Sequence, residues 1–457
     1  MKTYRDLDPA TGETIAEIPI TSPEELTAAI ARARAAQPAW QALGVAARCE
    51  LLSGLIPALE EAADELADLA TREMGKPRRE ALGEVKGWAA GIAKELEEVA
   101  KALEPESYPS DGSETEVVRV AHGVVGVITP WNFPVGMPLQ IMTPALATGN
   151  TVVFKPSEMV PLTGQRIAEI VQKLLPAGVC ELVHGEGDVG AALVAGDVDM
   201  IGFTGSRETG MRIMESASRG LKRLILELGG KDPMVVFEDA DLDAAAECAV
   251  RHSLRNAGQV CCAVERVYVA DSIADDFEQR VAEKAAEWKA GNGFEETSKM
   301  GPLVSAKQRE IVATHVADAV DSGARLLLGG EQPGGPGNFY PATVLADVRQ
   351  DMRITREETF GPVVSLTRFS GSEEEAITLA NDTPYGLGAS VFSGDEERGV
   401  RVAAAMRAGQ VGINRYLGGA PGTPWVGARQ SGFGFLGGIE GHRQFTTPKT
   451  ISRLISS

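Results

Sequence analysis

Two adjacent cysteines, Cys261 and Cys262, lie in the stretch "NAGQVCCAVERVYV" of a chain that has only five cysteines. A cysteine reacts as a nucleophile through its thiolate, so either residue could attack an electrophile if this stretch enters a cleft. The alternative is packing, because free cysteine is among the most buried residue types. The choice depends on which other reactive groups the fold brings to the same place.

Glu227 and Asn132 are the candidates for those groups. Glu227 ends the apolar run "RLILE", where a partly desolvated carboxylate can accept a proton near neutral pH. Asn132 follows Trp131 at the end of another apolar run and offers a neutral amide donor for an oxyanion. Both positions are predicted to lie where strands of a sheet end.

A dinucleotide site is predicted beside them, because parallel sheets bind ligands beyond the carboxyl ends of their strands. In "FTGSRETG" the amides of Gly205 and Ser206 would face a phosphate at a helix N-terminus. Lys155 and Glu158 close a neighbouring strand, and a carboxylate there can accept hydrogen bonds from ribose hydroxyls. Neither segment is a GxGxxG motif, so tight turns or solvated loops are the alternatives. Together with the thiol, carboxylate and amide, these groups favour oxidation through a covalent thioester.

The elements that must position these residues are those of an α/β fold. Residues 23–103 have the spacing of amphipathic helices, and from Val124 short apolar strands alternate with helices. Such strands predict parallel sheets covered on both faces, in two units joined near residues 227–232. The segment "EPESYPSDGSE" has the composition of turns, whereas "TEVVRVAHG" and the tail "FTTPKTISRLISS" alternate as exposed strands do.

Composition excludes several function classes. The net charge of −20 disfavours nucleic acid as a partner, since phosphate binding needs a basic face. Residues 1–9 contain no apolar signal segment, and no run of about 18 apolar residues predicts a membrane span. Cysteines and histidines are scattered without metal-ligand spacing, so no metal site and a reducing, cytoplasmic location are expected.

The order of "PWNFP", "FTGSRETG", "LELGGKDP", "NAGQVC" and "EETFGPV" resembles the aldehyde dehydrogenase superfamily over nearly the whole chain. The resemblance implies a Rossmann-like cofactor domain over residues 1–103 and 122–227 and an α/β catalytic domain over residues 228–425. It also implies small oligomerisation strands at residues 104–121 and 445–457, which would join chains into homodimers or homotetramers. One departure stands out: the family often has "SGxGRE" where this chain has "SGFGFL", which places Phe435 and Leu436 at the charged positions.

The same resemblance assigns roles to residues. Cys261 would form the thiohemiacetal and thioester, Asn132 and the Cys261 amide would stabilise the oxyanion, and Glu227 would activate water to release a carboxylic acid. The implied cofactor contacts are Thr129, Trp131, Lys155, Ser157, Glu158, Gly205, Ser206, Leu228, Glu358 and Phe360. The implied substrate pocket is formed by Phe133, Met137, Gln140, Val260, Cys262 and Trp425.

NAD is the expected cofactor, because Glu158 would repel a 2′-phosphate; NADP is the alternative if Lys155 pairs with that phosphate. The pattern is most similar to the succinate-semialdehyde dehydrogenase branch, which implies a semialdehyde or small aliphatic aldehyde as substrate. Arg415, in the loop "NRYLGGAPGTPW", would either meet a substrate carboxylate or lie at the surface. Two other functions stay open: an acyl-CoA-forming dehydrogenase and a catalytically silent relative.

Overall fold

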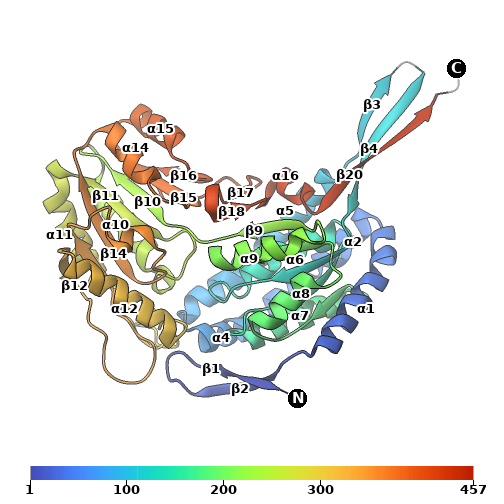
Figure 1. Ribbon diagram of the computed structural model, residues 1–457, viewed down its shortest axis with the longest axis horizontal. Coiled ribbons are helices and arrows are strands. Elements are labelled where there is room, and N and C mark those ends of the chain that lie inside the picture. Colours follow the sequence, from blue (N-terminus) through green and yellow to red (C-terminus); the bar gives the residue numbers. More distant parts are fainter. Residues whose placement is uncertain (1, 111, 456–457) are drawn as a thin grey trace.

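The computed structural model describes residues 2–110 and 112–455 and contains two main β-sheets with helices on their faces (Figure 1). This arrangement confirms the predicted α/β class. Residues 1, 111 and 456–457, which belong to segments assigned above, lie outside the described residues. The N-terminal region begins with a hairpin of β1 (Thr3–Leu7) and β2 (Thr14–Pro19), which the sequence did not predict.

The predicted helical region forms five helices between residues 23 and 102. Ser22 and Glu25 form a reciprocal capping box at the start of the first helix. The buried faces of the five helices pack on the first sheet. These helices are α1 (Pro23–Ala42), α2 (Val45–Ser53), α3 (Leu55–Glu61), α4 (Ala63–Met74) and α5 (Arg78–Ala102). Among the described residues, no single helix has the length and apolar character of a membrane span, although the bent pair formed by residues 23–42 and 45–61 does so on length and composition alone.

The first sheet has six strands in the order β18-β9-β8-β5-β6-β7. Its central strands are buried at every position, which explains why they are rich in Val, Ile and Phe. The strands are β5 (Val124–Ile128), β6 (Thr151–Lys155), β7 (Cys180–Leu182), β8 (Met200–Thr204), β9 (Arg223–Glu227) and β18 (Gly432–Phe433). Their covering helices are α6 (Gly136–Ala147), α7 (Pro161–Leu174), α8 (Gly187–Ala195) and α9 (Arg207–Ser218).

The second sheet has seven strands in the order β12-β13-β14-β11-β10-β15-β16, parallel except for β12. The strands are β10 (Asp232–Val236), β11 (Val264–Ala270), β12 (Arg325–Leu328), β13 (Thr343–Ala346), β14 (Val363–Phe369), β15 (Gly388–Phe392) and β16 (Gln410–Ile413). Its helices are α10 (Leu242–Leu254), α11 (Ala274–Ala285), α12 (Ala306–Asp321), α13 (Arg353–Arg356), α14 (Glu373–Asn381) and α15 (Glu396–Ala405). The chain passes from the first sheet to the second at residues 228–231.

The C-terminal region then returns to the first sheet. Strand β18 pairs antiparallel with β9, which places Gly432 opposite Glu227. A short pair of β17 (Trp425–Val426) and β19 (Phe435–Leu436) follows, and α16 (Gly438–Arg443) packs on α5. Leu436 is fully buried in the hydrophobic core around the first sheet, so the apolar residue at this position fills that core.

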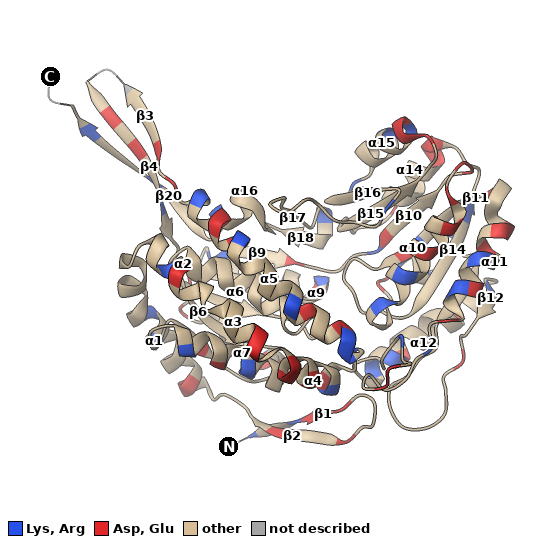
Figure 2. Cartoon of the chain, turned by 180° about the vertical axis from the view of Figure 1, so that it is seen from behind, with Lys and Arg blue, Asp and Glu red and all other residues tan. Residues whose placement is uncertain are grey.

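A three-stranded sheet projects from the body (Figure 1). It contains β3 (Glu106–Ser110), β4 (Ser113–Ala121) and β20 (Thr446–Leu454), with charged positions along β4 and β20 (Figure 2). The prediction of turns for the segment around β3 is therefore wrong, because Glu106 to Ser110 pair with β4. The two predicted strands, β4 and β20, pair with each other within one chain, and the outer edges of β3 and β20 stay open.

Candidate active site

A cavity of about 690 Å³ lies beyond the carboxyl ends of β5, β6 and β8. The sheet order reverses between β5 and β8, and such a switch point is where open α/β sheets bind ligands. Most of the predicted cofactor residues line this cavity, namely Thr129, Trp131, Lys155, Ser157, Glu158, Gly205 and Ser206.

The polar groups of this cavity fit a dinucleotide. Ser206 caps the N-terminus of α9 by accepting from the Thr209 N–H, and the Gly205 N–H donates to the Glu227 carbonyl, so a phosphate at this helix end would meet the remaining first-turn amides. The hydroxyls of Thr129 and Thr204 are buried without a hydrogen-bond partner within the described part of the chain. Burial lowers the pKa of the Lys155 ammonium, which lies 3.6 Å from the Glu158 carboxylate. A ligand carrying phosphates and hydroxyls would satisfy these groups.

A second, smaller cavity of about 240 Å³ shares Trp131, Gly205 and Ser206 with the first. It is lined by the predicted nucleophile and by residues from both sheets, including Asn132, Met137, Leu228, Cys261, Glu358 and Phe360. The structure thus brings together residues that are up to 229 positions apart, from Trp131 to Phe360. Their roles stay predictions, but their common location is what the proposed chemistry needs.

A left-handed turn carries Cys261 into this cavity. Asn256, Ala257 and Gly258 all have positive φ, between 53° and 71°, which is costly for the two residues that bear a Cβ. The Asn256 amide secures the turn by donating to the carbonyls of Asn132 and Gln259, each at 3.1 Å. Gly258 is required for a further reason, since a Cβ there would lie 2.0 Å from the Gly361 carbonyl oxygen.

The two cysteines have different surroundings. Cys261 is partly exposed and lines the cavity, whereas Cys262 is buried and its sulfur lies 2.9 Å from the Tyr416 hydroxyl. The hydrogen bond between the two thiols, together with burial, raises the pKa of Cys261. The same bond lowers the pKa of Cys262, and the Tyr416 hydroxyl adds to this effect. Position therefore favours Cys261 as nucleophile, while its proton needs an acceptor before attack.

Asn132 is held where an oxyanion donor is needed. Its side-chain amide donates to the Gln259 carbonyl at 3.1 Å, which leaves one N–H of the same nitrogen available beside Cys261. Among the described residues, the Cys261 backbone N–H donates to no protein acceptor. These two donors match the predicted oxyanion pair.

Glu227 ends β9, and the next residue, Leu228, lines the smaller cavity, which we call the catalytic cavity. Burial raises the pKa of Glu227 well above its usual range, and the nearby indole of Trp425 opposes the rise. Within the described residues neither carboxylate oxygen accepts a hydrogen bond. A buried carboxylate without partners is costly unless it is protonated or hydrated, which suits a group that accepts a proton from water.

The predicted substrate pocket is largely one apolar cluster. Phe133, Val260, Cys262 and Trp425 pack together with Leu387, Leu417 and Tyr416. Met137 lines the catalytic cavity, and Gln140 lies one turn later on α6, half-buried. Arg415 is exposed, and its guanidinium donates to the Tyr416 carbonyl. This arrangement favours the surface location over contact with a substrate carboxylate.

Sequence reasoning missed Tyr416 within the loop that follows β16. Its hydroxyl donates to the Cys262 carbonyl at 2.7 Å as well as to the Cys262 sulfur, and its ring stacks on His252 at 3.5 Å. Tyr416 therefore connects the loop that follows β16 to the segment that carries Cys261 and Cys262. A tyrosine in a glycine-rich loop gives no local signal of such a contact.

Glu358 and Phe360 extend from the loop before β14 and line the smaller cavity. Phe360 meets Trp131 edge to face, with ring centroids 5.5 Å apart. The Glu358 carboxylate accepts a hydrogen bond from the Gly230 N–H at 3.0 Å, and burial raises its pKa to about 8. A Cβ at position 229 would lie 2.3 Å from that carboxylate, so a larger residue there would displace the Glu358 side chain.

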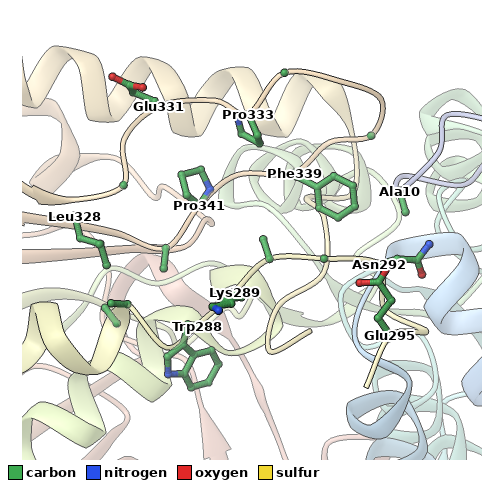
Figure 3. Close-up of a pocket in the computed structure, with 18 of the residues that line it drawn as sticks. Ala10, Trp288, Lys289, Asn292, Glu295, Leu328, Glu331, Pro333, Phe339 and Pro341 are labelled. Atoms are coloured by element: carbon green, nitrogen blue, oxygen red, sulfur yellow. The ribbon is translucent and has the colours of Figure 1, made fainter. Parts of the chain in front are cut away.

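Another cavity, of about 770 Å³, lies between Ala10, the segment after α11 and the loop after β12 (Figure 3). Trp288, Phe339 and several prolines line it, and none of the predicted site residues does. The described residues also contain no cluster of His, Cys, Asp or Glu that could hold a metal ion. The chemistry is therefore assigned to the two adjoining cavities between the sheets.

Comparison with known proteins identifies the family of this chain. A model of the aldehyde dehydrogenase family matches residues 1–451. The chain is 39% identical over 449 residues to a probable NADP(+)-dependent succinate-semialdehyde dehydrogenase of Sinorhizobium fredii, covering 97% of this chain and 91% of that protein. It is 40% identical over 463 residues to the betaine aldehyde dehydrogenase of Bacillus subtilis, covering 98% and 93%.

Solved structures are equally similar. PnpE in complex with nicotinamide adenine dinucleotide superposes with a TM-score of 0.96 and is 38% identical, covering 100% of this chain and 95% of that one. Lactaldehyde dehydrogenase from Escherichia coli also gives a TM-score of 0.96 at 38% identity, covering 99% and 96%. The family match over nearly the whole chain and these relatives lead to one conclusion. The chain belongs to the aldehyde dehydrogenase family.

Proposed function

We propose that this NAD(P)-dependent aldehyde dehydrogenase oxidises a semialdehyde to a carboxylic acid at Cys261. The observation that carries the proposal is the cavity that gathers Cys261, Asn132, Glu358 and Phe360 and adjoins a dinucleotide-sized cavity. A thiol nucleophile, oxyanion donors and a place for a nicotinamide are the parts that such an oxidation needs.

Cys261 attacks the aldehyde carbon after losing its proton, and a thiohemiacetal forms. The free N–H of Asn132 and the Cys261 backbone N–H stabilise the oxyanion, because both donors are already fixed by the turn at residues 256–258. A nicotinamide held beside Cys261 by Trp131, Glu358 and Phe360 would supply the acceptor for the hydride of the former aldehyde carbon. The apolar cluster of Phe133, Val260 and Trp425 excludes bulk water from the sulfur until then.

Glu227 completes the cycle by hydrolysis. Its carboxylate accepts a proton from a water molecule, the water oxygen bonds to the thioester carbon, and the carbon–sulfur bond breaks to return Cys261. The absence of hydrogen-bond partners to Glu227 in the described structure leaves both oxygens available to that water. This glutamate favours hydrolysis over transfer of the acyl group to coenzyme A.

Arg255 supports an anionic substrate. Its guanidinium lies 5.6 Å from the Phe133 ring centroid, and its charge contributes to the lowered pKa of Cys262. Arg255 forms no salt bridge within the described residues. Glu80 on α5 is its nearby carboxylate: burial raises the pKa of Glu80, and the charges of Lys76 and Arg255 oppose that rise. An exposed cation at the edge of the substrate pocket can meet a carboxylate. The succinate- and glutarate-semialdehyde dehydrogenases among the relatives support the same class.

A substrate panel tests this proposal. We expect succinic semialdehyde to give a higher kcat/KM than an aliphatic aldehyde, benzaldehyde or an aminoaldehyde, with reduced cofactor and acid formed in equal amounts. Arg255→Leu should lower kcat/KM for the semialdehyde by about tenfold, the effect of about 1.4 kcal/mol, mainly through KM. The uncharged aldehydes serve as the control, because their kcat/KM should stay within about twofold. An aminoaldehyde as best substrate would contradict the anionic class.

NAD is the preferred cofactor in this proposal. Glu158 is partly exposed in the cofactor cavity and would repel a 2′-phosphate, while its carboxylate can accept from a 2′-hydroxyl. Lys155 and Arg212 in the same cavity are the groups that could favour NADP, and two relatives are named for that cofactor. The panel run with both cofactors decides: a kcat/KM for NADP equal to that for NAD contradicts the argument from Glu158.

The projecting sheet supports a homodimer or homotetramer. The open edges of β3 and β20 carry exposed apolar side chains, Tyr108, Ile451 and Leu454, which a second chain would cover. We propose a cytoplasmic enzyme, in keeping with five free cysteines and the bacterial relatives. Light scattering should give a mass of at least two chains at micromolar concentration. A mass of 48.3 kDa would contradict the oligomer.

A further inference from the structure

A buried ion pair, Lys231 and Glu265, lies beneath the loop that carries Glu358 and Phe360. Both side chains are almost fully buried, with 0% and 6% of their surface exposed, and the Lys231 ammonium contacts the Glu265 carboxylate directly. The ammonium also donates to the Thr359 hydroxyl at 3.1 Å. Lys231 lies in "LELGGKDP" between the two sheets, and Glu265 lies in β11, four residues after Cys261.

The Glu265 carboxylate uses both of its oxygens on the backbone of this loop. Oε2 accepts from the Thr359 N–H at 2.8 Å, and Oε1 accepts from the Phe360 N–H at 2.9 Å. Phe360 has a φ of 52°, in the left-handed region that residues with a Cβ rarely adopt. The two charge-assisted hydrogen bonds therefore hold a turn that the local sequence does not favour.

The turn determines where the loop directs its side chains. Glu358 reaches back to the Gly230 N–H, one residue before Lys231, and Phe360 reaches the Trp131 ring. Both side chains line the catalytic cavity with Cys261. Because Glu265 is the second residue of β11, the strand that follows the nucleophile, one carboxylate connects the loop carrying Glu358 to the segment carrying Cys261.

We propose that Glu265, paired with Lys231, is a positioning residue that holds Glu358 and Phe360 against the nicotinamide half of the dinucleotide and so sets the rate of hydride transfer. The inference rests on the proposed function, in which Glu358 and Phe360 contact that half. A purely structural role is the competing explanation. Buried ion pairs are weak evidence of a stabilising purpose, since apolar replacements of similar volume are often as stable.

Glu265→Gln is the informative substitution. The glutamine carbonyl can accept from only one of the two N–H groups, and its own NH₂ would face the other as donor against donor. The single variant leaves the Lys231 ammonium unpaired. The double variant Lys231→Met/Glu265→Gln removes that buried charge, so we expect it to keep the fold while still lacking the second carboxylate oxygen as an acceptor. Glu278→Gln is the matched control, because Glu278 is equally buried and paired with Arg325 and Arg368 away from both site cavities.

Rapid mixing with saturating NAD and aldehyde gives two readouts: the amplitude of the reduced-cofactor burst counts competent sites, and its rate reports hydride transfer. We expect both Glu265 variants to keep the amplitude but to transfer hydride about 10 to 100 times more slowly, the cost of a misplacement near 1 Å. The KM for NAD should change less than about threefold, since most cofactor contacts lie in the other cavity. A deuterated aldehyde should slow the variants' burst, which shows that hydride transfer is the step observed.

The outcomes separate the two proposals. A wild-type burst rate in both Glu265 variants overturns the inference, as does a slow single variant whose rate the double variant restores. An equal loss of rate in Glu278→Gln also overturns it, because the effect would then be general to buried, ion-paired carboxylates. A wild-type protein that forms no reduced cofactor from any aldehyde overturns the proposed function, and the inference with it.

Discussion

We expect Cys261→Ala to form no reduced cofactor and no acid, a loss on the order of 10⁴-fold or more, as when a covalent nucleophile is removed. No thiohemiacetal can form without this sulfur, so hydride transfer has no substrate. The cavity should persist, because cofactor contacts such as Trp131 and Ser206 do not involve the thiol. Reduced-cofactor absorbance in a single turnover measures the effect, and NAD binding checks that the site is intact.

Cys262→Ala is the matched control for that result. Cys262 is buried against Tyr416 and does not line the catalytic cavity, so both chemical steps should remain within about tenfold of wild type. A change in KM is expected, because the apolar cluster loses a member. The lower pKa of Cys262 makes this a real test, since acidity alone would favour it as nucleophile. A Cys261→Ala variant that still reduces NAD, beside an inactive Cys262→Ala variant, would show that the nucleophile is Cys262.

Glu227→Gln should separate the two halves of the reaction. The glutamine keeps the size of the side chain but cannot accept a proton from water, so steady-state acid formation should fall by about 10² to 10⁴-fold. The first turnover should still give up to about one equivalent of reduced cofactor per site, because Cys261 is intact. Rapid mixing followed by steady-state assay shows both phases in one experiment. A slower burst would indicate that Glu227 also takes the Cys261 proton.

The pH dependence of hydrolysis provides a second test of Glu227. Burial raises its pKa, so the ionised base is scarce at low pH and increases as the pH rises through that pKa. Steady-state acid formation in the wild type should therefore rise with pH over this range, and Glu227→Gln should lose that rise. Added coenzyme A should have no effect on either protein. A CoA-dependent rate would contradict hydrolysis and favour the acyl-CoA-forming alternative.

The sequence by itself determined the class of fold and the family. Continuous apolar strands such as β5, β6 and β8 predict a covered parallel sheet because each is buried on both faces, and the structure confirms it. The motifs around Asn132, Glu227 and Cys261 were enough to place this chain in the aldehyde dehydrogenase family. Local sequence patterns predict these features because neighbouring residues determine both the burial of a strand and the reactive groups at its end.

Only the tertiary structure decided which long-range contacts position those residues. The two-residue strand β18 joins Glu227 across 205 positions, and a strand so short has no periodicity to read. The Glu265 contacts to Thr359 and Phe360 and the Tyr416 contact to Cys262 likewise join distant segments, and no local pattern marks either partner. The left-handed residues Asn256, Ala257 and Phe360 run against local preference, because hydrogen bonds from distant parts of the chain hold them. The sequence thus predicted candidate reacting groups, and the long-range contacts that position them appear only once the chain has folded.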